Sequence, residues 1–110
     1  PTRRSSDLRI HMLEINKTKE NGVGCIKLIG ELDTVSATDL EKEIDGFLDD
    51  LTELTIDMEK LEYITSAGLR LLLVMEQTME DQGEMIVINV CPDVMDVFEV
   101  SGFSEVLNIQ

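Results

Sequence analysis

Apolar and polar residues alternate in two short segments near the start of the chain, Leu13–Thr18 and Val23–Ile29, and this pattern predicts two strands. Asn21-Gly22 between them is typical of a tight hairpin turn. A third alternating segment, Glu53–Met58, predicts another strand. Glu84–Val90 is a continuous apolar run, which favours a central strand covered on both faces.

A helix is predicted from about Ser36, with Asp39 three residues later in a capping-box arrangement. Its apolar residues recur at helical spacing as far as Leu51 and mark one buried face. A second helix is predicted from about Ser66 to Gln82. Its segment Leu69–Met75 is apolar nearly all round, which is typical of core and also leaves one edge as a candidate docking surface.

A short third helix is predicted over Asp93–Ser101, with Gly102 as its natural stop, and Val106–Ile109 is expected to form a last strand. The resulting order is ββαβαβαβ. Because crossovers between parallel strands are right-handed, this order predicts an α/β fold with a small mixed, mostly parallel sheet and helices mainly on one face.

The chain has 110 residues, of which 43% are apolar and 29% charged, and this composition fits one globular domain. No apolar run reaches the roughly 18 residues that a membrane span needs, and no signal peptide is evident. We therefore expect a cytoplasmic protein without direct membrane insertion.

Residues Pro1–His11 are polar and basic, and His11-Met12 is a pair that a common cloning site leaves before a native start. We expect Pro1–His11 to be a tag remnant and residues 12–110 to form the single domain. Without the remnant, the chain holds six basic and 22 acidic residues, so its formal charge moves from −14 to −16. Such an acidic surface disfavours nucleic acid and favours a basic or mixed partner.

Candidate ligands for a metal are few, because the only histidine falls in the expected tag remnant. Cys25 and Cys91 lie far apart without ligand-like spacing, and we expect both to be buried, reduced thiols. No phosphate loop, nucleophile elbow or catalytic triad is present. The sequence thus predicts neither metal nor cofactor, and a protein that is not an enzyme.

The segment Tyr63–Leu73 combines a strand end, four small residues and the start of an apolar helix. This order brings the hydroxyl of Ser66 to the first turn, where free N–H groups and the helix dipole can hold an anion such as phosphate. A serine there can equally serve as an ordinary N-cap. Because functional groups gather at the carboxyl ends of parallel strands, the loop at Asp33 is expected to lie near Ser66.

Three motifs of this chain together resemble the STAS domain, a family named after sulfate transporters and anti-sigma factor antagonists. They are Ile29-Gly30-Glu31-Leu32-Asp33, Leu54-Thr55-Ile56-Asp57-Met58 and Tyr63-Ile64-Thr65-Ser66-Ala67-Gly68-Leu69. Val100-Ser101-Gly102-Phe103 is similar to the closing helix of the family. The similarity covers essentially all of Leu13–Ile109.

The resemblance implies a stand-alone bacterial anti-sigma factor antagonist, which regulates transcription indirectly. Members bind an anti-sigma factor with serine kinase activity, and phosphorylation of the serine at the helix start breaks the complex. A metal-dependent serine phosphatase restores binding. By position, the acceptor is Ser66, and partner contacts are expected at Asp33, Thr65, Ser66, Gly68, Leu69 and Arg70.

Two positions depart from the family pattern: Thr65 stands where many members have Asp, and Ala67 where many have Ser or Thr. Thr65 is therefore a second candidate acceptor. Gly68 is either simply a glycine accepted in the first turn of the helix, or it lets a partner backbone approach closely. Asp33 either caps the following turn or contacts the partner. Arg70 could stabilise a phosphate on Ser66.

Two other functions are alternatives to this one. A phosphorelay receiver needs a lysine after a late strand, but none follows Lys60, and Asp57 lies inside its strand. The alternative within the STAS fold is a soluble accessory subunit of a lipid or anion transporter that is not phosphorylated.

Overall fold

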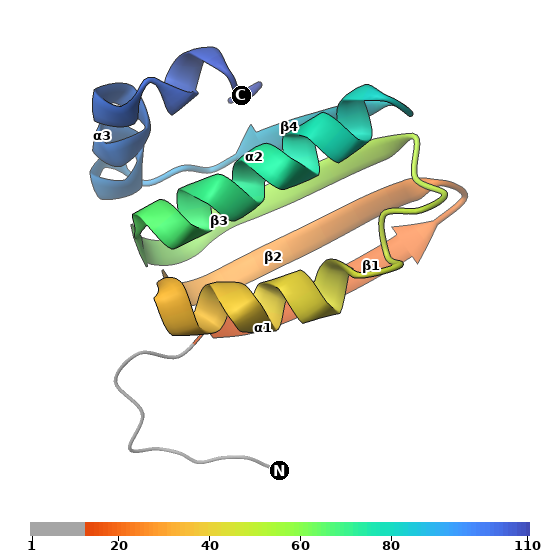
Figure 1. Cartoon of the computed structure of the whole chain (residues 1–110), viewed down its shortest axis with the longest axis horizontal. Helices are drawn as coiled ribbons and strands as arrows, with labels where there is room; N and C mark the ends of the chain where they lie inside the picture. Colours follow the sequence, from red (N-terminus) through yellow and green to blue (C-terminus); the bar gives the residue numbers. More distant parts are fainter. Residues whose placement is uncertain (1–12) are drawn as a thin grey trace, which may run out of the picture.

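The structure is a computed structural model that describes residues 13–110 (Figure 1), so the predicted tag remnant, Pro1–His11, lies outside the described residues. The described chain forms a four-stranded sheet with three helices and one 3-10 helix. In chain order, the elements are β1 (Leu13–Glu20), β2 (Val23–Leu32), α1 (Thr34–Ile44), β3 (Glu53–Ile64), α2 (Ser66–Glu80), β4 (Glu84–Ile88), α3 (Pro92–Ser101) and the 3-10 helix η2 (Phe103–Glu105).

The strands lie in the order β1-β2-β3-β4, with β1 antiparallel to β2 and the other neighbours parallel. The predicted mixed, mostly parallel sheet is confirmed. Asn21 and Gly22 both have positive φ, 54° and 81°, which is the geometry of the tight hairpin turn expected there.

Strand β4 is not the central strand that its apolar run predicted. Beyond it, the described chain adds only an isolated bridge between Val87 and Ile109, in place of the predicted strand Val106–Ile109. Met85 and Val87 face the core, whereas Ile86 and Ile88 are only half-buried on the other face. An apolar run does not reveal how many strands will pair with it. Here β4 pairs with β3 on one side and has only the bridge to Ile109 on the other.

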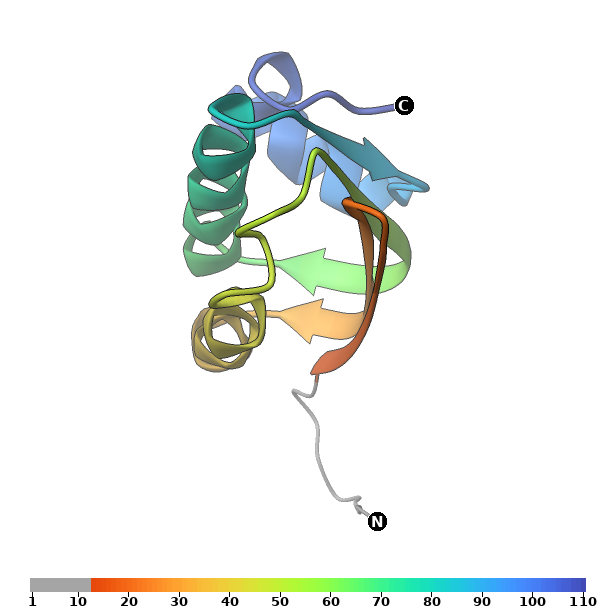
Figure 2. The same ribbon diagram turned by 90° about the vertical axis from the view of Figure 1, so that its right-hand side faces the viewer.

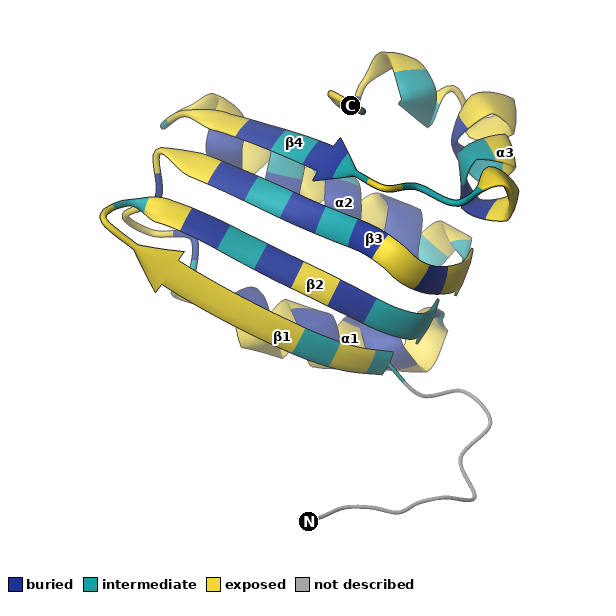
Figure 3. Cartoon of the chain, turned by 180° about the vertical axis from the view of Figure 1, so that it is seen from behind, coloured by how far each residue is buried: buried dark blue, intermediate teal, exposed yellow. Residues whose placement is uncertain are grey.

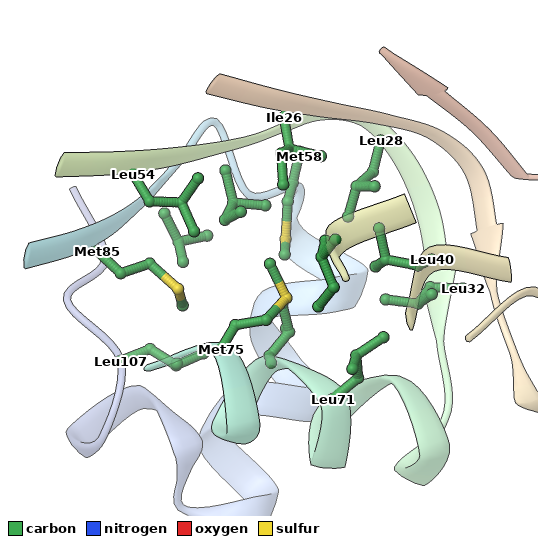
Figure 4. Close-up of a cluster of buried hydrophobic side chains, with 14 of the residues drawn as sticks. Ile26, Leu28, Leu32, Leu40, Leu54, Met58, Leu71, Met75, Met85 and Leu107 are labelled. Carbon is green, nitrogen blue, oxygen red and sulfur yellow. The ribbon is translucent and has the colours of Figure 1, made fainter. Parts of the chain in front are cut away.

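Helices α1 and α2 cover one face of the sheet, as predicted (Figures 1 and 2), and no helix of the described chain covers the opposite face (Figure 3). The core fills the space between these helices and the sheet (Figure 4). Leu72, Met75 and Met79 of α2 are completely buried there. The apolar stretch of α2 is therefore mostly core, although Val74 is 48% exposed.

Helix α1 differs from its prediction at both ends. It begins at Thr34, because Asp33 rather than Ser36 is the N-cap. It ends at Ile44, because Asp45 is extended and Gly46 adopts a positive φ of 83°. Phe47, Leu48 and Leu51 keep apolar spacing in the turns beyond it, which is why the periodicity alone extended the helix too far.

Two further predictions need correction or refinement. Strand β3 continues to Ile64 instead of stopping at Met58, and its pairing with β2 contains irregularities. Cys25 and Cys91 are both free, but each is only half-buried rather than buried. By contrast, α3 ends where predicted, with Gly102 in the left-handed conformation.

Candidate functional site

The starts of α1 and α2 meet at one edge of the sheet (Figure 1). Leu32 and Ile64, the last residues of β2 and β3, are register partners, and the amide of Thr65 donates to the carbonyl of Leu32 over 3.0 Å. Asp33 and Thr65 follow these two residues directly. The predicted proximity of the Asp33 loop to Ser66 is thus confirmed.

At the start of α1, the protein satisfies its own free amides. The carboxylate of Asp33 accepts hydrogen bonds from the amides of Val35, at 3.1 Å, and Ser36, at 2.9 Å. In return, the hydroxyl of Ser36 accepts from the amide of Asp33 at 2.8 Å and donates to the carbonyl of Glu31 at 2.8 Å. This capping box stabilises the helix, so the predicted capping role of Asp33 is confirmed.

The start of α2 lacks such a cap. Thr65 occupies the N-cap position, but its side chain makes no capping hydrogen bond, and its hydroxyl lies 3.5 Å from the carbonyl of Leu32 instead. Within residues 13–110, neither a side chain nor a loop carbonyl accepts from the amides of Ser66, Ala67 and Gly68. These amides and the positive end of the helix dipole therefore form a site suited to an anion.

Ser66 is the first residue of α2 and is exposed, whereas Thr65 is half-buried. In the described part of the chain, no hydrogen bond engages the hydroxyl of Ser66. Arg70 is also exposed and lies one turn further along the same side of α2. A phosphate on Ser66 would therefore meet free amides on one side and a guanidinium within one helical turn.

Two residues of the predicted contact set do not lie on the surface. A Cβ atom on Gly68 would come within 2.7 Å of Leu32 and 2.8 Å of Ile64, so the glycine allows α2 to pack closely on the sheet. Leu69 is 8% exposed and belongs to the core. Both residues help to hold α2 on the sheet, and their contact with a partner stays a prediction.

Two exposed apolar residues at this edge were missed by the sequence analysis. Val35, in the first turn of α1, is 72% exposed, and Tyr63, two residues before Thr65, is 51% exposed. The signal for Val35 was available, because it lies outside the apolar face that Leu40 and Ile44 define. Exposed apolar side chains beside a polar turn are typical of a protein interface.

The groups with shifted pKa values lie away from this edge. Burial, with smaller contributions from Glu80 and Glu84, raises the pKa of Glu76 near the far end of α2. Burial also raises the pKa of the Cys25 thiol on β2. A hydrogen bond from Lys19 lowers the pKa of Asp50 in the loop before β3.

Residues 13–110 contain neither a candidate metal site nor a helix suited to span a membrane. No group of three or more His, Cys, Asp or Glu side chains in this range is arranged to hold a metal ion. None of the helices in the range is long and apolar enough to cross a membrane.

Comparison with known proteins agrees with this geometry. The profile of the STAS domain family matches residues 14–110. The chain is 33% identical over 99 residues to BtrV of Bordetella bronchiseptica, which is provisionally named an anti-sigma factor antagonist; the match covers 88% of this chain and 85% of BtrV.

Solved structures of similar fold include an anti-sigma factor antagonist from Mycobacterium paratuberculosis, with a TM-score of 0.81 and 22% identity over 90% of this chain and 86% of that one. The unphosphorylated form of the anti-sigma factor antagonist SpoIIAA has a TM-score of 0.74 and 24% identity over 90% of this chain and 88% of that one. The phosphorylated form, from Bacillus, has a TM-score of 0.67 and 24% identity over 90% of this chain and 91% of that one.

Proposed function

Because this chain belongs to the STAS domain family, we propose that it is an anti-sigma factor antagonist whose binding is switched off by phosphorylation of Ser66. The observation that carries this proposal is the uncapped start of α2, where an exposed hydroxyl stands beside three amides without an acceptor. In this function, the chain regulates transcription indirectly, in the cytoplasm, and acts by binding rather than by catalysis.

The partner in this proposal is an anti-sigma factor with serine kinase activity. In the transfer, the Ser66 oxygen forms a bond to the γ-phosphorus of ATP, the bond to the β-phosphate oxygen breaks, ADP leaves, and a base of the kinase takes the hydroxyl proton. A metal-dependent serine phosphatase then hydrolyses the phosphoserine with water and restores the hydroxyl.

The accessibility of the two residues supports Ser66 over Thr65 as the acceptor. The Thr65 hydroxyl is half-buried and turned toward the carbonyl of Leu32, whereas the Ser66 hydroxyl is exposed. A kinase must bring the acceptor oxygen in line with the γ-phosphate, which requires access from solvent. We therefore keep Ser66 as the proposed acceptor.

The phosphate acts as an off-switch through charge and desolvation. It adds about −1.5 to −2 charges at pH 7 to a chain whose formal charge is already −14. The free amides of α2 and Arg70 stabilise the phosphate in the unbound protein. A partner that covers this turn would have to remove water from it, which weakens the complex.

The partner surface that we propose combines polar and apolar groups. Asp33, Thr65, Ser66 and Arg70 supply the polar contacts, and Val35 is the apolar neighbour. The two backbone hydrogen bonds that Asp33 accepts hold its side chain in place at the start of α1, beside the turn that carries Ser66.

The test uses the anti-sigma factor kinase of the same host, with binding measured by calorimetry. We expect Ser66→Asp to lower the affinity about tenfold or more, and Ser66→Ala to retain it while abolishing phosphorylation. Gln77→Asp is the matched control, because it adds the same charge at an exposed position further along α2.

Equal affinities for Ser66→Asp and Gln77→Asp would contradict the switch. Fragment mass spectrometry of protein recovered from the host identifies the acceptor: a phosphate on Thr65 would move it by one residue. The absence of phosphate under growth and stress would favour the accessory-subunit alternative.

A further inference from the structure

Helices α1 and α2 lie side by side on the same face of the sheet (Figures 1 and 2). Residues of both helices line a groove between them. One part has a volume of about 510 Å³ and extends to Asp49 beyond the end of α1. The other, of about 310 Å³, extends to Ala67 and Arg70 at the start of α2. The two parts share Thr38, Glu41, Leu71 and Val74, so they form one continuous groove.

The floor of the groove is apolar. Ile44, Leu48 and Leu71 line the groove, and each is between 6% and 8% exposed. Val74 also lines the groove and is 48% exposed. An apolar floor with an exposed apolar wall is suited to receive apolar side chains from another protein.

The rim of the groove at the far end of α1 is acidic. Glu41, Asp45 and Asp49 line this part, against a single base, Lys42. In residues 13–110, none of the three carboxylates forms an ion pair; the ion pairs of this region join Lys17 to Glu43 and Lys19 to Asp50. Lys17 already donates to the carbonyl of Glu43 in the last turn of α1, at 2.8 Å, so the attraction of the rim for positive charge comes from the three carboxylates.

We propose that this groove is a docking surface for a basic amphipathic helix of a partner protein. The helix lays its apolar side chains on Leu71, Val74 and Ile44, and its Lys or Arg side chains reach Asp45 and Asp49. A helix suits the site because a third helix can pack into the groove between two others. The inference rests on the proposed function only in placing this helix on the anti-sigma factor. The interface between the two proteins would then extend from Ser66 along the whole groove.

The first test needs no natural partner. A synthetic helical peptide with Leu on one face and Lys on the other is titrated into isotope-labelled protein, and amide shifts are followed by NMR. The control peptide has Glu in place of every Lys. We expect shifts along Ala37–Asp49 and Ala67–Thr78 with the Lys peptide alone. Shifts that fall elsewhere, that are equal for both peptides, or that are absent would overturn the inference.

The second test separates the groove from the switch. Asp45→Lys with Asp49→Lys reverses the rim, and Asp96→Lys with Glu99→Lys makes the same change of charge at exposed positions on α3. We expect the rim variant to bind the anti-sigma factor about tenfold more weakly than the α3 variant. Thermal unfolding checks that both variants are folded.

The outcomes distinguish the two proposals. If Ser66→Asp weakens the complex and the rim variant binds like the α3 variant, the groove inference fails and the switch stands. If the rim variant weakens the complex and Ser66→Asp does not, the groove stands and the switch fails.

Discussion

Helices α1 and α2 begin at the same edge of the sheet, after neighbouring parallel strands, yet their first turns differ. Asp33 and Ser36 satisfy the start of α1 with a capping box, whereas Thr65 leaves the start of α2 without a side-chain cap. The fold places both turns equally well for contact with a ligand. They differ in whether a side chain of the protein already accepts hydrogen bonds from the free amides of the helix start.

The serines of the two turns show the same contrast. Ser36 is only 3% exposed, and its hydroxyl is hydrogen-bonded within the turn and to Glu31. Ser66 is exposed, and no hydrogen bond within the described chain engages its hydroxyl. A serine near a helix start is therefore structural in one case and available for chemistry in the other. Four substitutions test how the two helix starts differ, beginning with the largest expected effect.

Gly68→Val should cause the largest loss of stability. The new side chain would clash with Leu32 and Ile64 and push the start of α2 from the sheet, which we expect to lower the free energy of unfolding by about 3 kcal/mol. Gln77→Val is the matched control, and its loss should stay within about 1 kcal/mol because only helix propensity changes. Urea unfolding measures both, and equal losses would show that Gly68 does not hold α2 on the sheet.

Asp33→Ala and Thr65→Ala compare the two N-caps directly. We expect Asp33→Ala to lower the free energy of unfolding by about 1–2 kcal/mol, because two amides of α1 lose their acceptor. Thr65→Ala should change it by no more than about 0.5 kcal/mol, since its side chain makes no capping hydrogen bond. Similar losses in thermal or urea unfolding would contradict the contrast between the two turns.

Thr65→Asp should give a small effect of the opposite sign. A carboxylate at this N-cap can accept from the free amides of α2 and interact with the dipole, so we expect a gain of about 0.5–1 kcal/mol. Thr65→Asn supplies a cap without the charge and separates the two contributions. If neither variant raises the unfolding midpoint, the amides of α2 already have acceptors in solution.

The order of the elements as far as α3, the sheet class and the meeting of the Asp33 loop with Ser66 could all be predicted from the sequence. Hydrophobic periodicity reports which face of a segment is buried, and parallel strands bring their carboxyl ends to one edge. These properties depend on residues close together in the chain, and the structure confirms them.

The capping of the two helices was harder to predict, because it depends on where each strand stops. Ser36 followed by Asp39 and Asp33 followed by Ser36 both read as capping sequences. Pairing of Leu32 with Ile64 ends β2 at Leu32 and thereby makes Asp33 the cap. At α2, the position of Thr65 beside Leu32 turns its hydroxyl away from the amides that it could have capped.

Contacts between distant parts of the chain account for the remaining differences. Gly68 meets Leu32, which lies far from it in sequence, so no local pattern revealed that the glycine serves packing. Strand β4 has the composition of a central strand, but the number of its partners depends on the rest of the sheet. Local sequence thus predicts the elements and the faces they bury. Long-range packing decides which polar groups stay free, because a group finds a hydrogen-bond partner or remains exposed only once its neighbours in the fold are in place.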